Sequence, residues 1–106
     1  MLNSQTLFPG LEKLIPKARM RRVDSALSSL FTRTLTYLPD GSPFIITGDI
    51  PAMWLRDSTF QVKPLLHSNH PDVIELLIQV SKSQIRLFLI DPYANAFNPK
   101  PNGNCW

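Results

Sequence analysis

The sequence predicts an all-α protein with one small β-hairpin, and three observations lead to this fold class. Apolar residues recur at three- and four-residue steps through residues 23–38, which is the spacing of one helix face. A second apolar segment, residues 71–90, begins with a proline and is long enough for several helical turns. Between them, Pro39-Asp40-Gly41 has the composition of a tight turn, with a short β-prone run beside it.

The first expected helix begins at Pro16, because proline is favoured at the first helical position. Residues 1–15 have no clear periodicity, and Phe8-Pro9-Gly10 within them is typical of a turn. The apolar stripe of the helix consists of Val23, Ala26, Leu27, Leu30, Phe31, Thr34, Leu35 and Leu38. The helix must end by Leu38, because the turn at Pro39 follows directly.

A β-hairpin is expected next. The β-prone run at residues 44–47 can pair across the turn with residues 36–38. Gly48 and Pro51 then exclude a regular helix, so Asp49 should lie at the end of an extended segment.

The second expected helix begins at Ser58. Ser58 is a good N-cap, and Gln61 stands three residues further on, which is the spacing of a capping box. Arg56 and Asp57 would then lie at the mouth of this helix. Pro64 predicts a kink or an early end.

The longest expected helix extends from about Pro71 to Ile90. Its apolar residues cover most of its circumference: Val73, Ile74, Leu76, Leu77, Ile78, Val80, Ile85, Leu87, Phe88, Leu89 and Ile90. Such a helix should be buried on more than one side, and the two preceding helices barely suffice to cover it. The sequence therefore indicates missing packing partners. Residues 93–106 have no periodicity and predict a loop.

The composition limits the protein to a few classes. The length of 106 residues allows one domain, and a hydrophobic content of 43% allows a core. No apolar run is long enough for a transmembrane segment, and Met1 to Gly10 lacks the features of a secretory signal. The single cysteine, Cys105, excludes an internal disulfide and fits a reducing compartment. The compartment stays open, with the cytoplasm slightly favoured.

Neither nucleic acid nor a metal is expected as a partner. Much of the net charge of +3 comes from one basic cluster: Lys13, Lys17, Arg19, Arg21 and Arg22. A cluster of this kind is most often a solvated helix face, and no aromatic residues interleave with it. His67, His70 and Asp72 lie close together near helix ends, where such clusters are commonly solvent-exposed, so no metal or cofactor is predicted.

Chemically active side chains concentrate in residues 47–58, with the sequence Thr-Gly-Asp-Ile-Pro-Ala-Met-Trp-Leu-Arg-Asp-Ser. The carboxylates of Asp49 and Asp57 can each accept from two hydroxyls, and the guanidinium of Arg56 can donate to two oxygens. The face of Trp54 can cover the C–H patch of a pyranose ring. This chemistry suits a sugar, although an Arg-Asp neighbour pair is also common as a surface ion pair and a tryptophan is common in a core.

The same stretch, continued through Thr59 to Leu65, resembles the signature of glycoside hydrolase family 125, whose members are exo-acting α-1,6-mannosidases. A second match lies at residues 90–98, Ile-Asp-Pro-Tyr-Ala-Asn-Ala-Phe-Asn, followed by Pro101-Asn102-Gly103. Two long motifs in the right order are far more specific than one short pattern. The resemblance covers roughly Leu27 to Gly103.

The resemblance implies the N-terminal portion of an (α/α)6 barrel of the six-hairpin glycosidase type, with residues 1–106 as a single incomplete domain. It implies hydrolysis of terminal α-1,6-linked mannose with inversion of configuration, without a metal, on a mannose-containing oligosaccharide or glycan. Arg56 and Asp57 are carried over as sugar-binding residues, followed by Asp49 and Trp54. Asn95, Asn98 and Asn102 are expected at the same mouth.

No catalytic residue is assigned in this chain, because the resemblance places the acid and the base beyond its last residue. The chain alone is therefore expected to be inactive. The alternative is a non-catalytic fragment that acts as a binding or interaction module. A downstream reading frame with further helical hairpins and two acids would favour the enzyme, whereas a stop without them would favour the module. Oligomeric state and natural glycan stay open.

Overall fold

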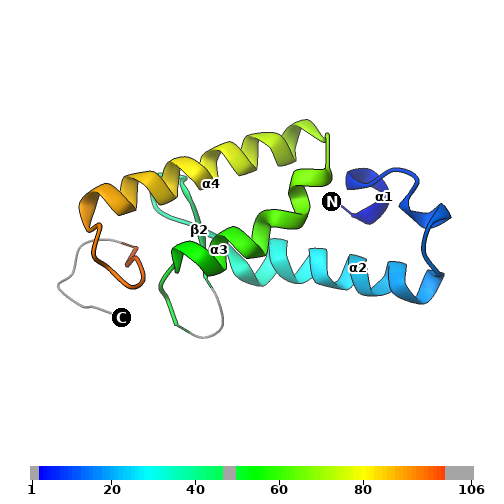
Figure 1. The fold of residues 1–106 in the computed structure, drawn as a ribbon, viewed down its shortest axis with the longest axis horizontal. Helices are drawn as coiled ribbons and strands as arrows, with labels where there is room; N and C mark the ends of the chain where they lie inside the picture. The colour runs from blue at the N-terminus through cyan, green and yellow to red at the C-terminus, as the bar shows by residue number, and fades with distance from the viewer. Residues whose placement is uncertain (1–2, 47–49, 100–106) are drawn as a thin grey trace.

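The computed structural model describes residues 3–46 and 50–99. Most of the described residues are helical, and two short strands form one hairpin (Figure 1). The elements in chain order are α1 (Ser4–Leu7), η1 (Leu11–Lys13), α2 (Lys17–Ser29), η2 (Leu30–Thr34), β1 (Leu35–Tyr37), β2 (Pro43–Ile45), α3 (Leu55–Val62), η3 (Lys63–His67) and α4 (Pro71–Ile90). The predicted all-α class with a small hairpin is confirmed, and this composition is consistent with a fragment of an α-helical domain.

Helix α1 lies in a segment for which the sequence predicted only a turn. The carboxamide oxygen of Asn3 accepts from the backbone N–H of Thr6 at 2.9 Å, which caps the helix. The backbone N–H of Ser4 donates to Asp24 Oδ1 at 2.8 Å, so the helix is tied to α2. Leu7 is buried in the core. The expected turn at Phe8-Pro9-Gly10 follows, with Gly10 at a φ of 89°.

Helix α2 ends earlier than its apolar stripe suggested. Regular α-helix stops at Ser29, and a π-helical turn, η2, leads directly into β1. The strands pair antiparallel with Leu35 opposite Ile45 and Tyr37 opposite Pro43, which confirms the predicted hairpin. Strand β1 lies one residue earlier than predicted, and β2 begins one residue earlier and ends at Ile45. Leu35 therefore reaches the core from a strand rather than from a helix, because pairing with β2 satisfies its backbone.

The predicted start of the second helix was wrong by one turn. Helix α3 begins at Leu55, with Trp54 as its N-cap residue. Ser58 does not cap the helix: it lies within α3, fully buried, and its hydroxyl donates to the carbonyl of Leu55 at 3.1 Å. The predicted effect of Pro64 is confirmed, because α3 ends at Val62 and a 3₁₀ segment, η3, continues the chain.

Helix α4 has the predicted bounds, and Pro71 occupies its first turn. Its buried face holds Val73, Val80, Ser83 and Leu87, which pack toward β2 and η3. Large apolar residues on the other side of α4 are exposed, which agrees with the expectation that the preceding helices do not suffice to cover this helix. The described part of the segment after α4, residues 91–99, is a loop, as predicted.

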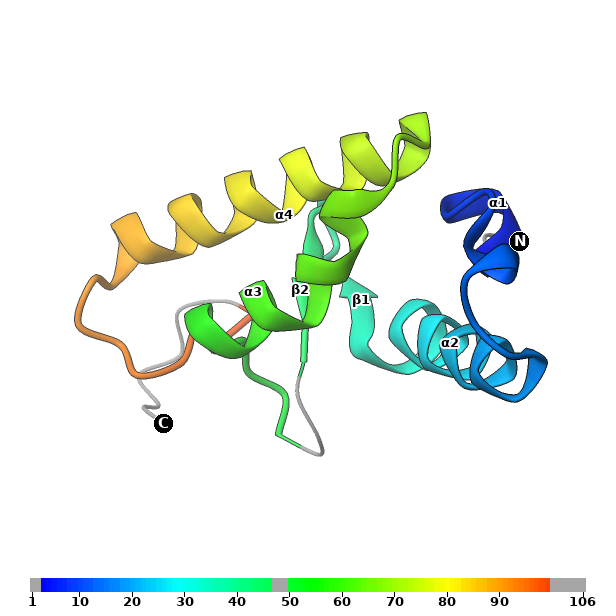
Figure 2. The same ribbon diagram turned by 45° about the vertical axis from the view of Figure 1, so that its right-hand side comes forward.

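The chain is more extended than a compact domain of its size. Its Cα radius of gyration is 15.1 Å, against about 13 Å for a compact domain of 100 residues. In both views α3 and η3 lie between α4 on one side and α2 on the other (Figures 1 and 2). Within the described ranges, no helix combines the length and the apolar character that crossing a membrane requires.

Candidate functional site

The two sequence motifs meet in the structure. Met53, from the first motif, and Phe97, from the second, form an antiparallel bridge. The N–H of Met53 donates to the carbonyl of Phe97 at 2.9 Å, and the N–H of Phe97 donates back at 2.8 Å. Both side chains are buried. The loop that follows α4 is therefore fastened to the segment that leads into α3, and Figure 1 shows both at the same end of the molecule.

The segment before α3 is also fixed to the hairpin. The backbone N–H of Ile45 faces the sulfur of Met53 at 3.3 Å, and both residues are completely buried. Ala52 is buried beside them, and its N–H donates to the carbonyl of Ile50 at 2.8 Å. The start of α3 is thus anchored to β2 and to the loop of the second motif.

Arg56 and Asp57 project from the first turn of α3. The Nε atom of Arg56 lies 3.6 Å from Oδ1 of Asp57, and their side chains are 84% and 43% exposed. The positive end of the helix dipole favours Asp57 at this position but disfavours Arg56. An exposed pair of this kind contributes only about 0–1 kcal/mol to stability. The ion pair of Arg56 with Asp57 therefore contributes little to the stability of the fold.

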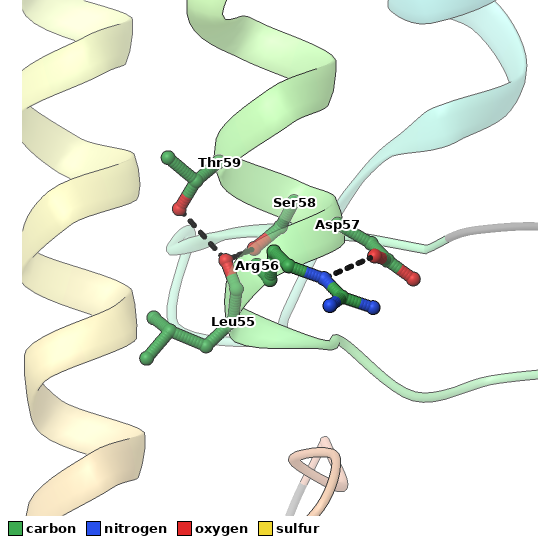
Figure 3. Close-up of polar contacts among 5 residues, drawn as sticks. All are labelled: Leu55, Arg56, Asp57, Ser58 and Thr59. Atoms are coloured by element: carbon green, nitrogen blue, oxygen red, sulfur yellow. Dashed lines mark hydrogen bonds and ion pairs between the residues drawn. The ribbon is translucent and has the colours of Figure 1, made fainter.

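The opposite side of the same turn is tied by hydrogen bonds. The hydroxyls of Ser58 and Thr59 both donate to the carbonyl of Leu55, at 3.1 and 2.7 Å (Figure 3). Nε2 of Gln84, on α4, donates to Ser58 Oγ at 2.8 Å and to Thr59 Oγ1 at 3.1 Å. In Figure 3 Thr59 points toward α4, whereas Asp57 points away from it. The turn thus has one side attached to α4 and one side open to solvent.

Three of the four predicted sugar-binding residues lie at the start of α3, where they are neighbours in the sequence. Trp54 is half-buried and directly precedes α3, so it is next to Arg56 and Asp57. Asp49 lies outside the described residues. Of the asparagines expected at the same mouth, Asn95 is exposed and Asn98 is half-buried, both beside the bridge at Phe97, while Asn102 lies outside the described residues.

Sequence reasoning missed Gln84 and Phe97. Gln84 belongs to a polar stretch of α4, and its two partners lie 26 and 25 residues earlier in the chain, so no local pattern reveals the contact. Phe97 belongs to the second motif, but the bridge to Met53 depends on where α4 directs the loop.

The arrangement suits recognition of hydroxyl groups. The open guanidinium of Arg56 carries donors, and the carboxylate of Asp57 accepts from hydroxyls. Among the described residues, no group of three or more His, Cys, Asp or Glu side chains could hold a metal ion. The side chains of this turn therefore offer donors and acceptors that suit neighbouring hydroxyls.

Comparison with known proteins gives two matches and one negative result. A family model described as metal-independent alpha-mannosidase, GH125, matches residues 11–105. The "Meiotically up-regulated gene 157 protein" of Schizosaccharomyces pombe is 40% identical over 57 residues, which are 52% of this chain and 11% of that protein. The matched part thus spans about a ninth of the relative's length. No solved structure matches the chain significantly.

Proposed function

Because the chain belongs to the GH125 family of metal-independent α-mannosidases, we propose that it serves as part of an enzyme that hydrolyses terminal α-1,6-linked mannose with inversion of configuration. The family itself indicates a glycosidase that acts on a glycan. We propose three further properties of the reaction: cleavage of α-1,6 linkages, removal of the terminal residue, and inversion of configuration. The observation that carries it is the meeting of both motifs beside an exposed Arg56.

The roles of the site residues follow from their chemistry. Arg56 donates to two oxygens of the terminal mannose, and Asp57 accepts from its hydroxyls. Trp54, next to them on the chain, supplies an apolar face for the C–H side of the ring. We include Asp49 among the sugar-binding residues on the strength of its place in the motif alone. These four residues bind and orient the sugar, and none of them acts as acid or base.

Inverting hydrolysis needs two carboxyl groups, about 6.5–9.5 Å apart, on opposite sides of the scissile bond. One protonates the departing oxygen, and the other activates a water molecule, so the reaction requires no metal. We propose that residues outside this chain supply both groups. The chain would then be a single incomplete domain of a longer helical barrel, in agreement with its small share of the relative's length.

Replacement of Arg56 tests the binding role. In the full-length enzyme, Arg56→Ala should lower kcat/KM for α-1,6-mannobiose about ten- to a hundredfold, because charged hydrogen bonds contribute about 1.5–3 kcal/mol each. Arg56→Lys should not restore activity, since a single ammonium cannot reproduce the planar fork. NMR detection of the first anomer released tests inversion in the same assay.

The matched control is Arg86→Ala. Arg86 also pairs with an aspartate on the surface, Asp40, at 4.0 Å, but it lies on α4 and belongs to neither motif. This variant should keep wild-type kcat/KM. A folded Arg56→Ala enzyme with full activity would remove Arg56 from the site, and an initial product of retained configuration would refute the proposed mechanism.

A further inference from the structure

We propose that Gln84 is a positioning residue for the sugar site and holds the first turn of α3 in the orientation that presents Arg56 and Asp57. This inference rests on the proposed function of that turn. Gln84 makes no hydrogen bond to Arg56 or Asp57; it acts through the hydroxyls of Ser58 and Thr59.

The donor and the acceptor of each hydrogen bond in this network are fixed by the chemistry of the groups. The carbonyl of Leu55 can only accept, so Ser58 and Thr59 must each use their single hydroxyl proton to reach it. Their oxygens are then left as acceptors for Gln84. The Nε2 group of Gln84 has two hydrogens, one for each hydroxyl, so every proton has one partner.

The first turn of α3 needs this support. Helix α3 has only eight residues, and isolated helices shorter than about 12–15 residues are marginal in water. Its N-cap residue, Trp54, makes no side-chain capping bond. The turn therefore lacks the usual local bond at its start, and Gln84 supplies a tertiary one instead.

The position of the tether explains why it bears on sugar binding. Ser58 is fully buried, so water cannot replace the bond from Gln84. Arg56 and Asp57 directly precede Ser58 on the same turn, and a rotation of the turn would move their side chains. Small displacements of orienting groups can lower catalytic efficiency severalfold or more.

The test uses two substitutions at Gln84 in the full-length enzyme. Gln84→Met keeps a similar length and removes both donors, and it should lower kcat/KM for α-1,6-mannobiose about tenfold. Gln84→Glu keeps the shape but offers only acceptors, so the hydroxyls must leave the Leu55 carbonyl. The kcat/KM of Gln84→Glu should therefore be no higher than that of Gln84→Met. The control is Gln79→Met on the same helix, where the amide bonds only Glu75 at 2.8 Å; it should leave kcat/KM unchanged.

A double-mutant cycle separates positioning from general stability. If Gln84 acts through Arg56 and Asp57, Gln84→Met should lower kcat/KM less than twofold in a background that already carries Arg56→Ala and Asp57→Ala. An equal tenfold loss in both backgrounds would show that Gln84 acts elsewhere and would overturn the inference. Where Gln84→Met fails to fold, Thr59→Val at an exposed position removes one of the two acceptors and should give about a threefold loss; wild-type activity in that variant would also overturn it.

The results for the two proposals stay distinguishable. A large loss of kcat/KM in Arg56→Ala, together with wild-type kcat/KM in Gln84→Met, would refute only the positioning role. Full activity in both variants would refute the binding role of the turn and, with it, the role of Gln84.

Discussion

Helices α2 and α4 lie on opposite sides of the molecule and differ in the faces they turn outward. The 13-residue α2 has polar and basic residues on its exposed side, which are Lys17, Arg19, Arg21, Arg22, Ser25, Ser28 and Ser29. The 20-residue α4 exposes large apolar residues, which are Ile74, Ile78, Ile85, Phe88, Leu89 and Ile90. Both helices also have a buried face in the common core.

The difference shows which side of the fold is complete. The outward face of α2 is suited to water as it stands. The outward side of α4 carries six large apolar side chains that are 44–74% exposed, a concentration on one helix that soluble monomers rarely leave uncovered. Since the matched segment is 11% of its relative's length, we expect further helices of the same polypeptide to cover α4. The following predictions test this contrast, from the largest effect to the smallest.

The largest expected effect is on the 106-residue chain by itself. Each large apolar side chain left exposed forgoes about 1.5–3 kcal/mol, against a typical domain stability of about 5–15 kcal/mol. The purified chain should hydrolyse no α-1,6-mannobiose, and it should aggregate or bind a dye that reports exposed apolar surface. A soluble monomer that unfolds cooperatively and turns over the disaccharide would contradict both expectations.

Lysine substitutions on the two outward faces should have unequal effects on the free energy of unfolding. In the full-length enzyme, Ile85→Lys should lower the free energy of unfolding by about 2–5 kcal/mol, the range for losing a buried isoleucine. Ser25→Lys on the outward face of α2 should change it by no more than about 0.5 kcal/mol. Urea unfolding measures both. Equal, small effects would mean that nothing covers α4.

The smallest expected effect concerns Asp40, in the hairpin turn beside α4. Hydrogen bonds from the side chain and the backbone N–H of Ser42, and then the charge of Arg86, hold the pKa of Asp40 below its ordinary value of 3.8. Because the folded pKa is lowered, the carboxylate stabilises the fold above pH 3.8, and this contribution is lost as the pH falls through the folded pKa.

Asp40→Ala should therefore lower the melting temperature slightly at neutral pH, and the difference should shrink as the pH falls below 3.8. Thermal scans of the full-length enzyme across a pH series measure it. A difference in melting temperature that grows as the pH falls would contradict this prediction. The effect should be smaller than that of Ile85→Lys, because Asp40 is exposed and water screens its interactions.

The sequence alone determined the elements whose signals are local. Pro71 marks the start of α4 because proline fits a first helical turn, and Pro39-Asp40-Gly41 sets the hairpin because Gly41 can take its φ of 86°. The candidate sugar-binding residues Arg56 and Asp57 were also named from sequence, because they belong to a recognisable motif. Each of these conclusions depends on neighbours a few residues apart.

Tertiary structure decided what depends on distant partners. Ser58 has the sequence of a helix cap, yet it is buried inside α3, where Leu55 and Gln84 satisfy its hydroxyl. The bridge of Met53 with Phe97 and the tether from Gln84 likewise join residues from different elements. A short polar side chain can bond to its own backbone or to a neighbouring element with similar energy. Ser58 does both: its hydroxyl donates to Leu55 in its own helix and accepts from Gln84 of α4, and only the folded chain brings Gln84 to this position.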